Sequence, residues 1–143
     1  MSDTIEIKIP AKPKYLRIVR LEIRFICEAM NFSSADINFI TLAVDEACSN
    51  IIKHAYGGPT DKPIEVTCHV HADRVEFVIR DYGKKSNIRK IKSRQLDDVR
   101  PGGLGVHLIK TAMDEVQYDN SLDVGNQLKL IKYINQRDRN VKH

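Results

Sequence analysis

The chain has 143 residues, of which 42% are hydrophobic and 29% are charged, and its formal net charge is +4. This length accommodates one domain, and the composition is that of an ordinary soluble globular protein. No apolar run approaches the roughly 20 residues of a membrane-spanning helix, which argues against a helical membrane protein. We therefore expect a single domain over residues 1–143, with a frayed polar tail at 135–143.

The N-terminus and the cysteines indicate a cytoplasmic protein. The first residues lack the basic start and the apolar stretch of a secretory signal. Cys27, Cys48 and Cys68 are odd in number and form no Cys-x-x-Cys pair. This pattern argues against both a disulfide framework and a zinc site, so we expect buried thiols.

The positive charge is concentrated in one segment, residues 84–100. It holds seven basic residues against Asp97 and Asp98, a local charge of +5, which leaves −1 for the rest of the chain. The segment has no aromatic residue on which a base could stack. Nucleic-acid binding is therefore disfavoured.

The hydrophobic pattern predicts a strand first, then two helices, a hairpin, a third helix and two final strands. The expected ranges are a strand over 5–9, helices over 16–30 and from 34 to about 54, hairpin strands over 64–71 and 75–80, a helix from the glycines at 102–105 to about 115, and strands near 116–119 and 127–134. Strands and helices do not alternate strictly. We expect an α+β fold, a two-layer sandwich of a mixed, mostly antiparallel sheet with helices on one face.

Two features of the first two helices bear on partners and on helix boundaries. Arg17, Arg20 and Arg24 share one stripe of the first helix, which is either a solvated face or a surface for an acidic partner. Ser33 is the expected N-cap of the second helix, with Asp36 completing a capping box.

The second helix carries Glu46 and Asn50 four residues apart, so both side chains lie on one face. An amide oxygen suits Mg²⁺ that keeps water and phosphate ligands, and a carboxylate can accept a proton from an attacking hydroxyl. His54, one turn further on, fits a helix C-terminal partner better than a base. Two solvated polar residues would give the same pattern.

Two further motifs suit a nucleotide. Gly102, Gly103 and Gly105 precede a helix, where backbone N–H groups can bind phosphate, although a glycine-rich helix cap would look the same. Asp81 closes an apolar strand and is followed by Gly83, so its carboxylate could accept the exocyclic amine of adenine. Turn chemistry explains the Asp-x-Gly sequence equally well.

Together these motifs resemble the anti-sigma-factor serine kinases of the RsbW type, in the GHKL, or Bergerat-fold, ATPase superfamily. The resemblance begins at Ile9-Pro10-Ala11-Lys12-Pro13, and includes the helix from Asp45 to Tyr56, the Asp81-Tyr82-Gly83 motif and the segment from Gly102 to Lys110. It extends through Met113-Asp114-Glu115-Val116. The order of these motifs is specific, although each alone is not.

The resemblance implies a kinase that transfers the ATP γ-phosphoryl group to a serine of a small STAS-type antagonist protein and that also sequesters a sigma factor or another regulator. It implies a homodimer, and it implies ATP and Mg²⁺ as ligands. Carried over by residue, Glu46 is the general base, Asn50 the Mg²⁺ ligand and Asp81 the carboxylate that reads adenine. The other implied nucleotide contacts are Gly83, Gly102, Gly103, Leu104, Gly105, Val106 and Gln127.

The chain departs from the family pattern at two places. The basic sequence Lys84-Lys85 follows Gly83, and Asn126-Gln127 stands where the family commonly has threonines near the adenine. These departures keep a second hypothesis open, a nucleotide-gated binding module with little kinase activity. In either case we expect Arg17 and Arg20 to contact an acidic surface of the partner.

Overall fold

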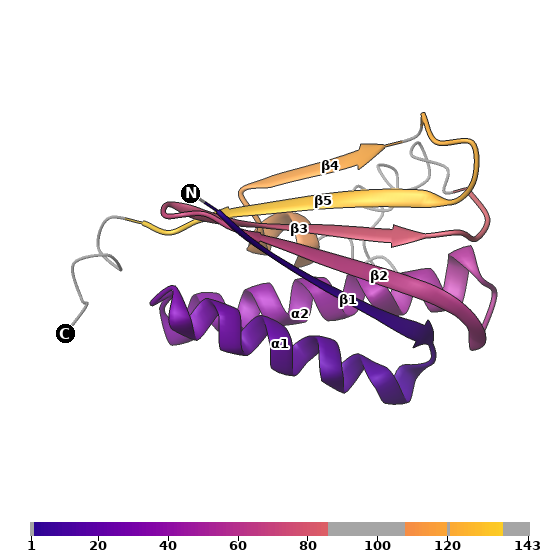
Figure 1. Cartoon of the computed structure of the whole chain (residues 1–143), viewed down its shortest axis with the longest axis horizontal. Coiled ribbons are helices and arrows are strands. Elements are labelled where there is room, and N and C mark those ends of the chain that lie inside the picture. Colours follow the sequence, from indigo (N-terminus) through magenta and orange to yellow (C-terminus); the bar gives the residue numbers. More distant parts are fainter. Residues whose placement is uncertain (1, 86–107, 120, 136–143) are drawn as a thin grey trace.

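The structure is a computed structural model that describes residues 2–85, 108–119 and 121–135. It contains one sheet with the strand order β1-β2-β3-β5-β4, and each described pairing is antiparallel (Figure 1). The strands are β1 (Asp3–Ala11), β2 (Thr60–Val70), β3 (Arg74–Asp81), β4 (Glu115–Asp119) and β5 (Asn126–Tyr133).

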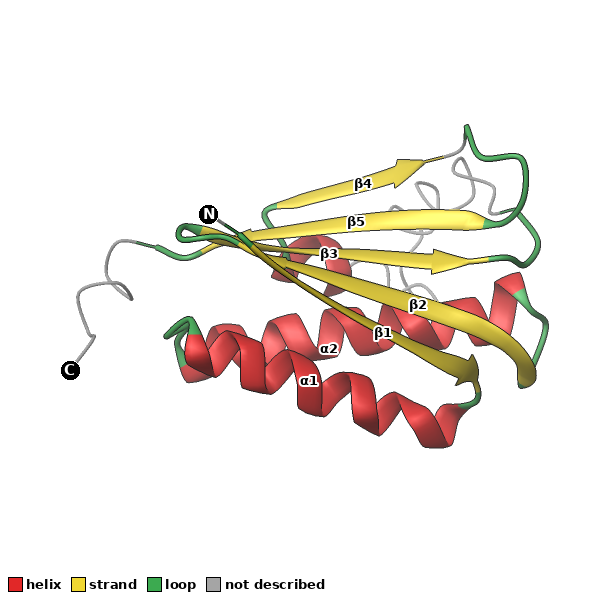
Figure 2. Ribbon diagram, in the orientation of Figure 1, coloured by secondary structure: helices red, strands yellow, loops and turns green. Residues whose placement is uncertain are grey.

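The helices α1 (Leu16–Ala29) and α2 (Ser34–Asn50) lie side by side against one face of the sheet (Figure 2). A short 3₁₀ turn, η1 (Pro13–Tyr15), precedes α1, and a π-helical turn, η2 (Ile51–Ala55), continues α2. The predicted two-layer α+β sandwich is confirmed. The sheet is antiparallel in all its described pairs rather than mixed.

The core lies between the helices and the sheet because apolar residues alternate along the central strands. Val75, Phe77 and Ile79 of β3 are buried, and they meet Ile23 of α1 and Ile40 of α2 in one continuous cluster. Each such side chain contributes about 1.5–3 kcal/mol by leaving water. The residues of β3 that alternate with this set, on the other face of the sheet, are mainly polar.

The predicted start of α2 is confirmed. The Ser33 hydroxyl oxygen accepts a hydrogen bond from the Asp36 N–H at 3.1 Å, which satisfies one of the free donors of the first turn. At the other end, the Tyr56 N–H donates to the Ile51 carbonyl at 2.9 Å and closes η2. The helical region thus ends at Ala55, one residue beyond the predicted end.

The third predicted helix ends earlier than expected. Residues 108–112 are helical, but β4 begins at Glu115, within the predicted helix. The physical reason is pairing with the sheet, because the Asp114 N–H donates to the Ile131 carbonyl at 2.9 Å. The segment 86–107 and the tail 136–143 lie outside the described residues.

All three cysteines are free and buried, as expected. Burial raises the pKa of Cys27 and of Cys48 to about 12, so both thiols stay protonated at neutral pH. In the described part of the chain, no helix is long and apolar enough to cross a membrane.

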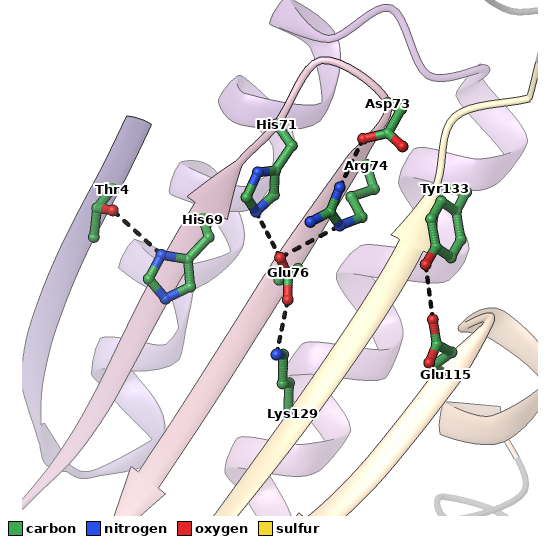
Figure 3. A network of polar contacts seen from close by, with 9 residues as sticks. All are labelled: Thr4, His69, His71, Asp73, Arg74, Glu76, Glu115, Lys129 and Tyr133. Carbon is green, nitrogen blue, oxygen red and sulfur yellow. Dashed lines mark hydrogen bonds and ion pairs between the residues drawn. The ribbon is translucent and has the colours of Figure 1, made fainter. Parts of the chain in front are cut away.

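A polar network occupies the sheet face that turns away from the helices (Figure 3). At its centre is Glu76, which is only 7% exposed. Its carboxylate lies 2.5 Å from His71 Nε2, 2.9 Å from Lys129 Nζ and 3.4 Å from Arg74 Nε. Desolvation opposes ionisation, but Lys129, His71 and Arg74 together hold the pKa of Glu76 below its ordinary value. The network therefore joins β3 to β5 and to the turn after β2.

Candidate nucleotide site

Asp81 ends β3, the central strand, as the sequence predicted, and is only 1% exposed. Its Oδ1 accepts hydrogen bonds from the Gly83 N–H at 2.9 Å and from Asn126 Nδ2 at 3.0 Å. Desolvation raises the pKa of Asp81 above its ordinary value, although these two bonds oppose the shift. The backbone of Asn126 adds a further hydrogen bond that favours the ionised carboxylate. A buried carboxylate held in place by these donors suits an amine such as that of adenine.

Asn126, which the sequence did not single out as a site residue, positions this carboxylate. It stands opposite Asp81 in the β3–β5 register, so the two side chains share the face that packs on the helices. Its Nδ2 also donates to the Lys84 carbonyl at 2.9 Å. The sequence signal that could have identified Asn126 is its amide directly after Gly125. A buried carboxylate such as that of Asp81 needs a hydrogen-bond donor, and an amide supplies one.

The strand register changes the expectation for Gln127. It pairs with Arg80 in the same register, and successive residues of a strand point to opposite faces. Gln127 therefore lies on the sheet face opposite to Asp81. Asn126, rather than Gln127, thus contacts the Asp81 carboxylate, which we expect to bind adenine.

The Asp81-Tyr82-Gly83 turn is fixed to the end of the long helix. The Lys84 N–H donates to the Ala55 carbonyl at 2.7 Å, and the Tyr82 N–H donates to the Tyr56 hydroxyl at 2.9 Å. A Cβ on Gly83 would lie 2.6 Å from the carbonyl carbon of Ala55. Gly83 is thus required because its backbone lies close to that of Ala55. The family resemblance had implied a different reason for this glycine, contact with the nucleotide.

Arg80 joins the same turn to the start of β5. Its guanidinium donates to the carbonyls of Asp81 at 2.9 Å and Val124 at 2.8 Å, and it lies over the Tyr82 ring at 4.5 Å. Arginine provides several donors in a fixed plane, so one side chain holds both loops. The sequence offered no sign of this role.

Glu46 and Asn50 are both half-buried on α2. Their spacing places them on one helix face, as predicted. Asn50 is five residues before Ala55, about 7 Å along a helix, and Ala55 contacts the turn after Asp81. Among described residues, no hydrogen bond or ion pair engages the Glu46 carboxylate, so it is available to accept a proton.

Within the described ranges, no group of three or more His, Cys, Asp or Glu side chains could hold a metal ion. Mg²⁺ keeps several waters and binds phosphate oxygens beside one or two protein groups. The Asn50 amide oxygen is such a group.

The two predicted partner-binding arginines differ. Arg17 is exposed, whereas Arg20 Nη1 lies 2.7 Å from Asp45 Oδ1 in an ion pair that joins α1 to α2. Asp45 precedes Glu46, so Arg20 contacts the helix of the site. The partner contact predicted for Arg20 stays a prediction, since one nitrogen bonds to Asp45 and the side chain is 40% exposed.

The expected phosphate loop, Gly102, Gly103, Leu104, Gly105 and Val106, lies outside the described residues. Among the described residues, the candidate site therefore consists of the turn around Asp81 and the face of α2 that carries Glu46 and Asn50.

Comparisons with known proteins show the family to which the chain belongs. The sequence profile of the histidine kinase-like ATPase domain matches residues 9–132. Serine-protein kinase RsbW of Bacillus licheniformis is 34% identical over 143 residues, covering 94% of this chain and 88% of the relative. The protein of that name from Bacillus subtilis is 32% identical over 142 residues, with 94% and 88% covered.

A solved structure shares the fold. It is a crystal structure of the RsbU and RsbW domains of a Mycobacterium tuberculosis protein, with a TM-score of 0.66 and 17% identity. The match covers 91% of this chain and 31% of that longer chain. From the profile match and the identity over nearly the whole length, the chain belongs to the RsbW family of serine-protein kinases, anti-sigma factors built on the ATP-binding histidine kinase-like ATPase domain.

Proposed function

We propose that the protein transfers the γ-phosphoryl group of ATP to a serine of a small STAS-type antagonist protein, and that it sequesters a sigma factor or another regulator in the cytoplasm. The observation that carries this proposal is the Glu46 carboxylate, unpaired among the described residues, on the helix whose end contacts the turn of the buried Asp81. Sequestration alone has no use for a base at that position. For this reason we favour the kinase over a binding module.

At the adenine end, the Asp81 carboxylate accepts the exocyclic amine while Gly83 and Asn126 hold its Oδ1 in place. A neutral carboxylic acid could not accept in the same way at both oxygens. The two hydrogen bonds favour the ionised form against the desolvation that raises the pKa of Asp81. The phosphates would lie toward Asn50.

At the phosphoryl end, Glu46 accepts the proton of the serine hydroxyl. The serine oxygen forms a bond to the γ-phosphorus, the bond from that phosphorus to the β–γ bridging oxygen breaks, and ADP leaves with the bonding electrons. The Asn50 amide oxygen would hold Mg²⁺, which neutralises phosphate charge when bound. Phosphoryl transfer needs mainly positioning and charge stabilisation, and these residues supply both.

For the partner, we propose that exposed Arg17 contacts an acidic surface of the antagonist or the regulator. Arg20 can contribute there with the donors that remain beside Nη1, because its side chain is 40% exposed. We also propose that the kinase acts as a homodimer, as the family resemblance implies.

The test is Glu46→Gln, assayed for transfer from Mg-ATP to STAS-type proteins of the same organism. Loss of a general base should lower the rate about 10²-fold or more, while calorimetry shows ATP binding within about twofold of wild type. Glu28→Gln, an exposed glutamate on α1, is the matched control and should keep full activity.

Undiminished transfer by Glu46→Gln would remove this residue from the role of base. Binding of ATP by the wild type without transfer to any of the tested proteins would instead support a nucleotide-gated binding module.

A further inference from the structure

We propose that Tyr56 is a positioning residue for the nucleotide, because its hydroxyl lies between β2 and the turn after β3 and fixes the place of the Asp81 carboxylate. This inference rests on the proposed function, since it takes Asp81 to be the group that accepts the exocyclic amine of adenine. It adds a residue that decides how well the site distinguishes adenine from a base without that amine.

The first step is the hydrogen-bond register of the β2–β3 hairpin. The hairpin closes with a bond from the His71 N–H to the Arg74 carbonyl at 2.9 Å, and the pairing is regular from there to Glu65. In an antiparallel pair, hydrogen-bonded positions recur at every second residue. Extended by two residues beyond Glu65, the register sets Pro63 opposite Tyr82 at such a position. A regular ladder would therefore have the Tyr82 N–H donate to the Pro63 carbonyl.

The structure has the hydroxyl of Tyr56 at this position instead. The Tyr82 N–H donates to the Tyr56 oxygen at 2.9 Å, and the Tyr56 hydroxyl donates to the Pro63 carbonyl at 2.6 Å. Proline has no N–H, so Pro63 could return no bond to its neighbour even in a regular ladder. The inserted hydroxyl thus replaces a single backbone bond, and it separates the turn after β3 from β2.

The surroundings of Tyr56 suit this insertion. The residue directly follows η2, and the end of the helical region, the start of β2 and the end of β3 lie at the same end of the molecule (Figure 1). Its ring is half-buried and packs against the core. Burial raises the pKa of Tyr56 above its ordinary value, so the hydroxyl keeps at neutral pH the proton that it donates to Pro63.

The inserted hydroxyl is one of three acceptors that fix the turn. The three backbone N–H groups that follow Asp81 donate in order to the Tyr56 hydroxyl, to Oδ1 of Asp81 and to the Ala55 carbonyl, at 2.9, 2.9 and 2.7 Å. The first and third bonds hold the turn against the end of the helical region. The second bond, which orients the carboxylate, depends on the shape that the other two give to the turn.

Loss of the hydroxyl would change the turn in one of two ways. The Tyr82 N–H would either lose its acceptor or bond directly to the Pro63 carbonyl, which would draw the turn toward β2. In both cases the Asp81 carboxylate moves relative to the base. Recognition of the exocyclic amine should therefore weaken, while contacts to the rest of the nucleotide persist.

The experiment uses the full chain and Tyr56→Phe, which removes the hydroxyl and keeps the ring against the core. Calorimetry compares Mg-ATP with the Mg complex of purine riboside triphosphate, which has hydrogen in place of the exocyclic amine. We expect the wild type to bind ATP about tenfold or more tightly than the analogue, since a hydrogen bond to a charged group is lost with the amine. In Tyr56→Phe, the Kd for ATP should rise about tenfold and the Kd for the analogue should stay within about twofold of wild type.

The matched control is Tyr133→Phe. The Tyr133 hydroxyl lies 2.9 Å from the Glu115 carboxylate, and Tyr133 pairs with the first residue of β3, at the end of that strand opposite to Asp81 (Figure 3). This variant also loses one tyrosine hydroxyl with its hydrogen bond. It should bind both nucleotides as the wild type does, and circular dichroism should show that both variants are folded at the temperature of the assay.

The outcomes separate this inference from the proposed function. An unchanged Kd for ATP in Tyr56→Phe would overturn the positioning role and leave the role of Asp81 standing. An equal loss of affinity for both nucleotides would also overturn it, because Tyr56 would then support the site as a whole rather than the carboxylate. Equal binding of ATP and the analogue by the wild type would show that Asp81 does not bind the amine, which would overturn that part of the proposed function together with this inference.

Discussion

The amide of Asn126 donates to Oδ1 of Asp81 at 3.0 Å, across the β3–β5 pair at the centre of the sheet. Asn126 is one of the places where the chain departs from the family pattern. Its bond holds the carboxylate that we propose binds the amine of adenine. The same amide holds the Lys84 carbonyl, so one side chain fixes both the carboxylate and the turn that follows it.

The first prediction concerns Asn126→Ala. Loss of the two hydrogen bonds should weaken ATP binding about tenfold, because each such bond contributes roughly 0.5–1.5 kcal/mol and the Asp81 carboxylate loses its fixed orientation. Calorimetry with Mg-ATP measures the change. Gln127→Ala is the control, since Gln127 lies on the opposite face, and it should bind ATP as the wild type does. A larger effect at Gln127 would mean that the sheet register does not decide which residue serves the nucleotide.

The second prediction is a pH effect at Asp81. Burial raises its pKa in the folded protein, so as pH rises the unfolded chain releases this proton first. The contribution of Asp81 to stability is therefore greatest below its unfolded pKa of about 4 and falls as pH rises through the raised folded pKa.

Asp81→Asn removes this titration and keeps an oxygen that can accept from Gly83 and Asn126. The stability of the variant relative to wild type should improve from about pH 3 to neutrality. Urea unfolding over that range gives the difference. A variant whose relative stability worsens with rising pH would show that the folded protein favours the charged carboxylate.

The third prediction has the opposite sign and concerns Glu76. Its pKa is lowered in the folded protein, so its contribution to stability is present above the unfolded pKa of about 4.3 and is lost as pH falls through the folded pKa. Glu76→Gln should cost about 1.5–3 kcal/mol at neutral pH, the contribution of hydrogen bonds to a charged group. The cost should shrink in acid. Denaturation at neutral and acidic pH tests it, and a cost independent of pH would assign the effect to packing.

The fourth prediction compares two glycines with nearly equal backbone angles. Gly57 has φ +72° and open space where an added methyl group would lie, whereas Gly125 has φ +74° and a Cβ there would lie 2.7 Å from the Cα of Tyr82. Gly57→Ala should cost only the left-handed backbone penalty, about 1–2 kcal/mol.

Gly125→Ala should cost a further 1–3 kcal/mol or so, because backbone would have to move. It should also weaken ATP binding, since the displaced backbone is that of Asp81 and Tyr82. Thermal unfolding of both variants measures the contrast. Equal costs would show that the close approach of β5 to the turn after β3 is easily relaxed.

Much of the fold could be predicted from the sequence because its signals are local. The Ser33 cap, the alternation of Ile64, Val66 and Cys68, and the turn before Arg74 each depend on a few neighbouring residues, and each is confirmed. The shared face of Glu46 and Asn50 followed in the same way from helical spacing. The end of the third helix was predicted too late because a pairing with Ile131, distant in sequence, determines where β4 begins.

The sequence by itself determined the family, the layer architecture and the shared helix face of the candidate residues Glu46 and Asn50, because periodicity and motif order depend only on the order of residues along the chain. Only the tertiary structure decided that Asn126 rather than Gln127 meets Asp81, that Arg20 is already paired with Asp45, and that Gly83 accommodates the backbone of Ala55. These relationships depend on strand register and on helix packing. Both are set by contacts between residues far apart in the chain, which no local pattern encodes.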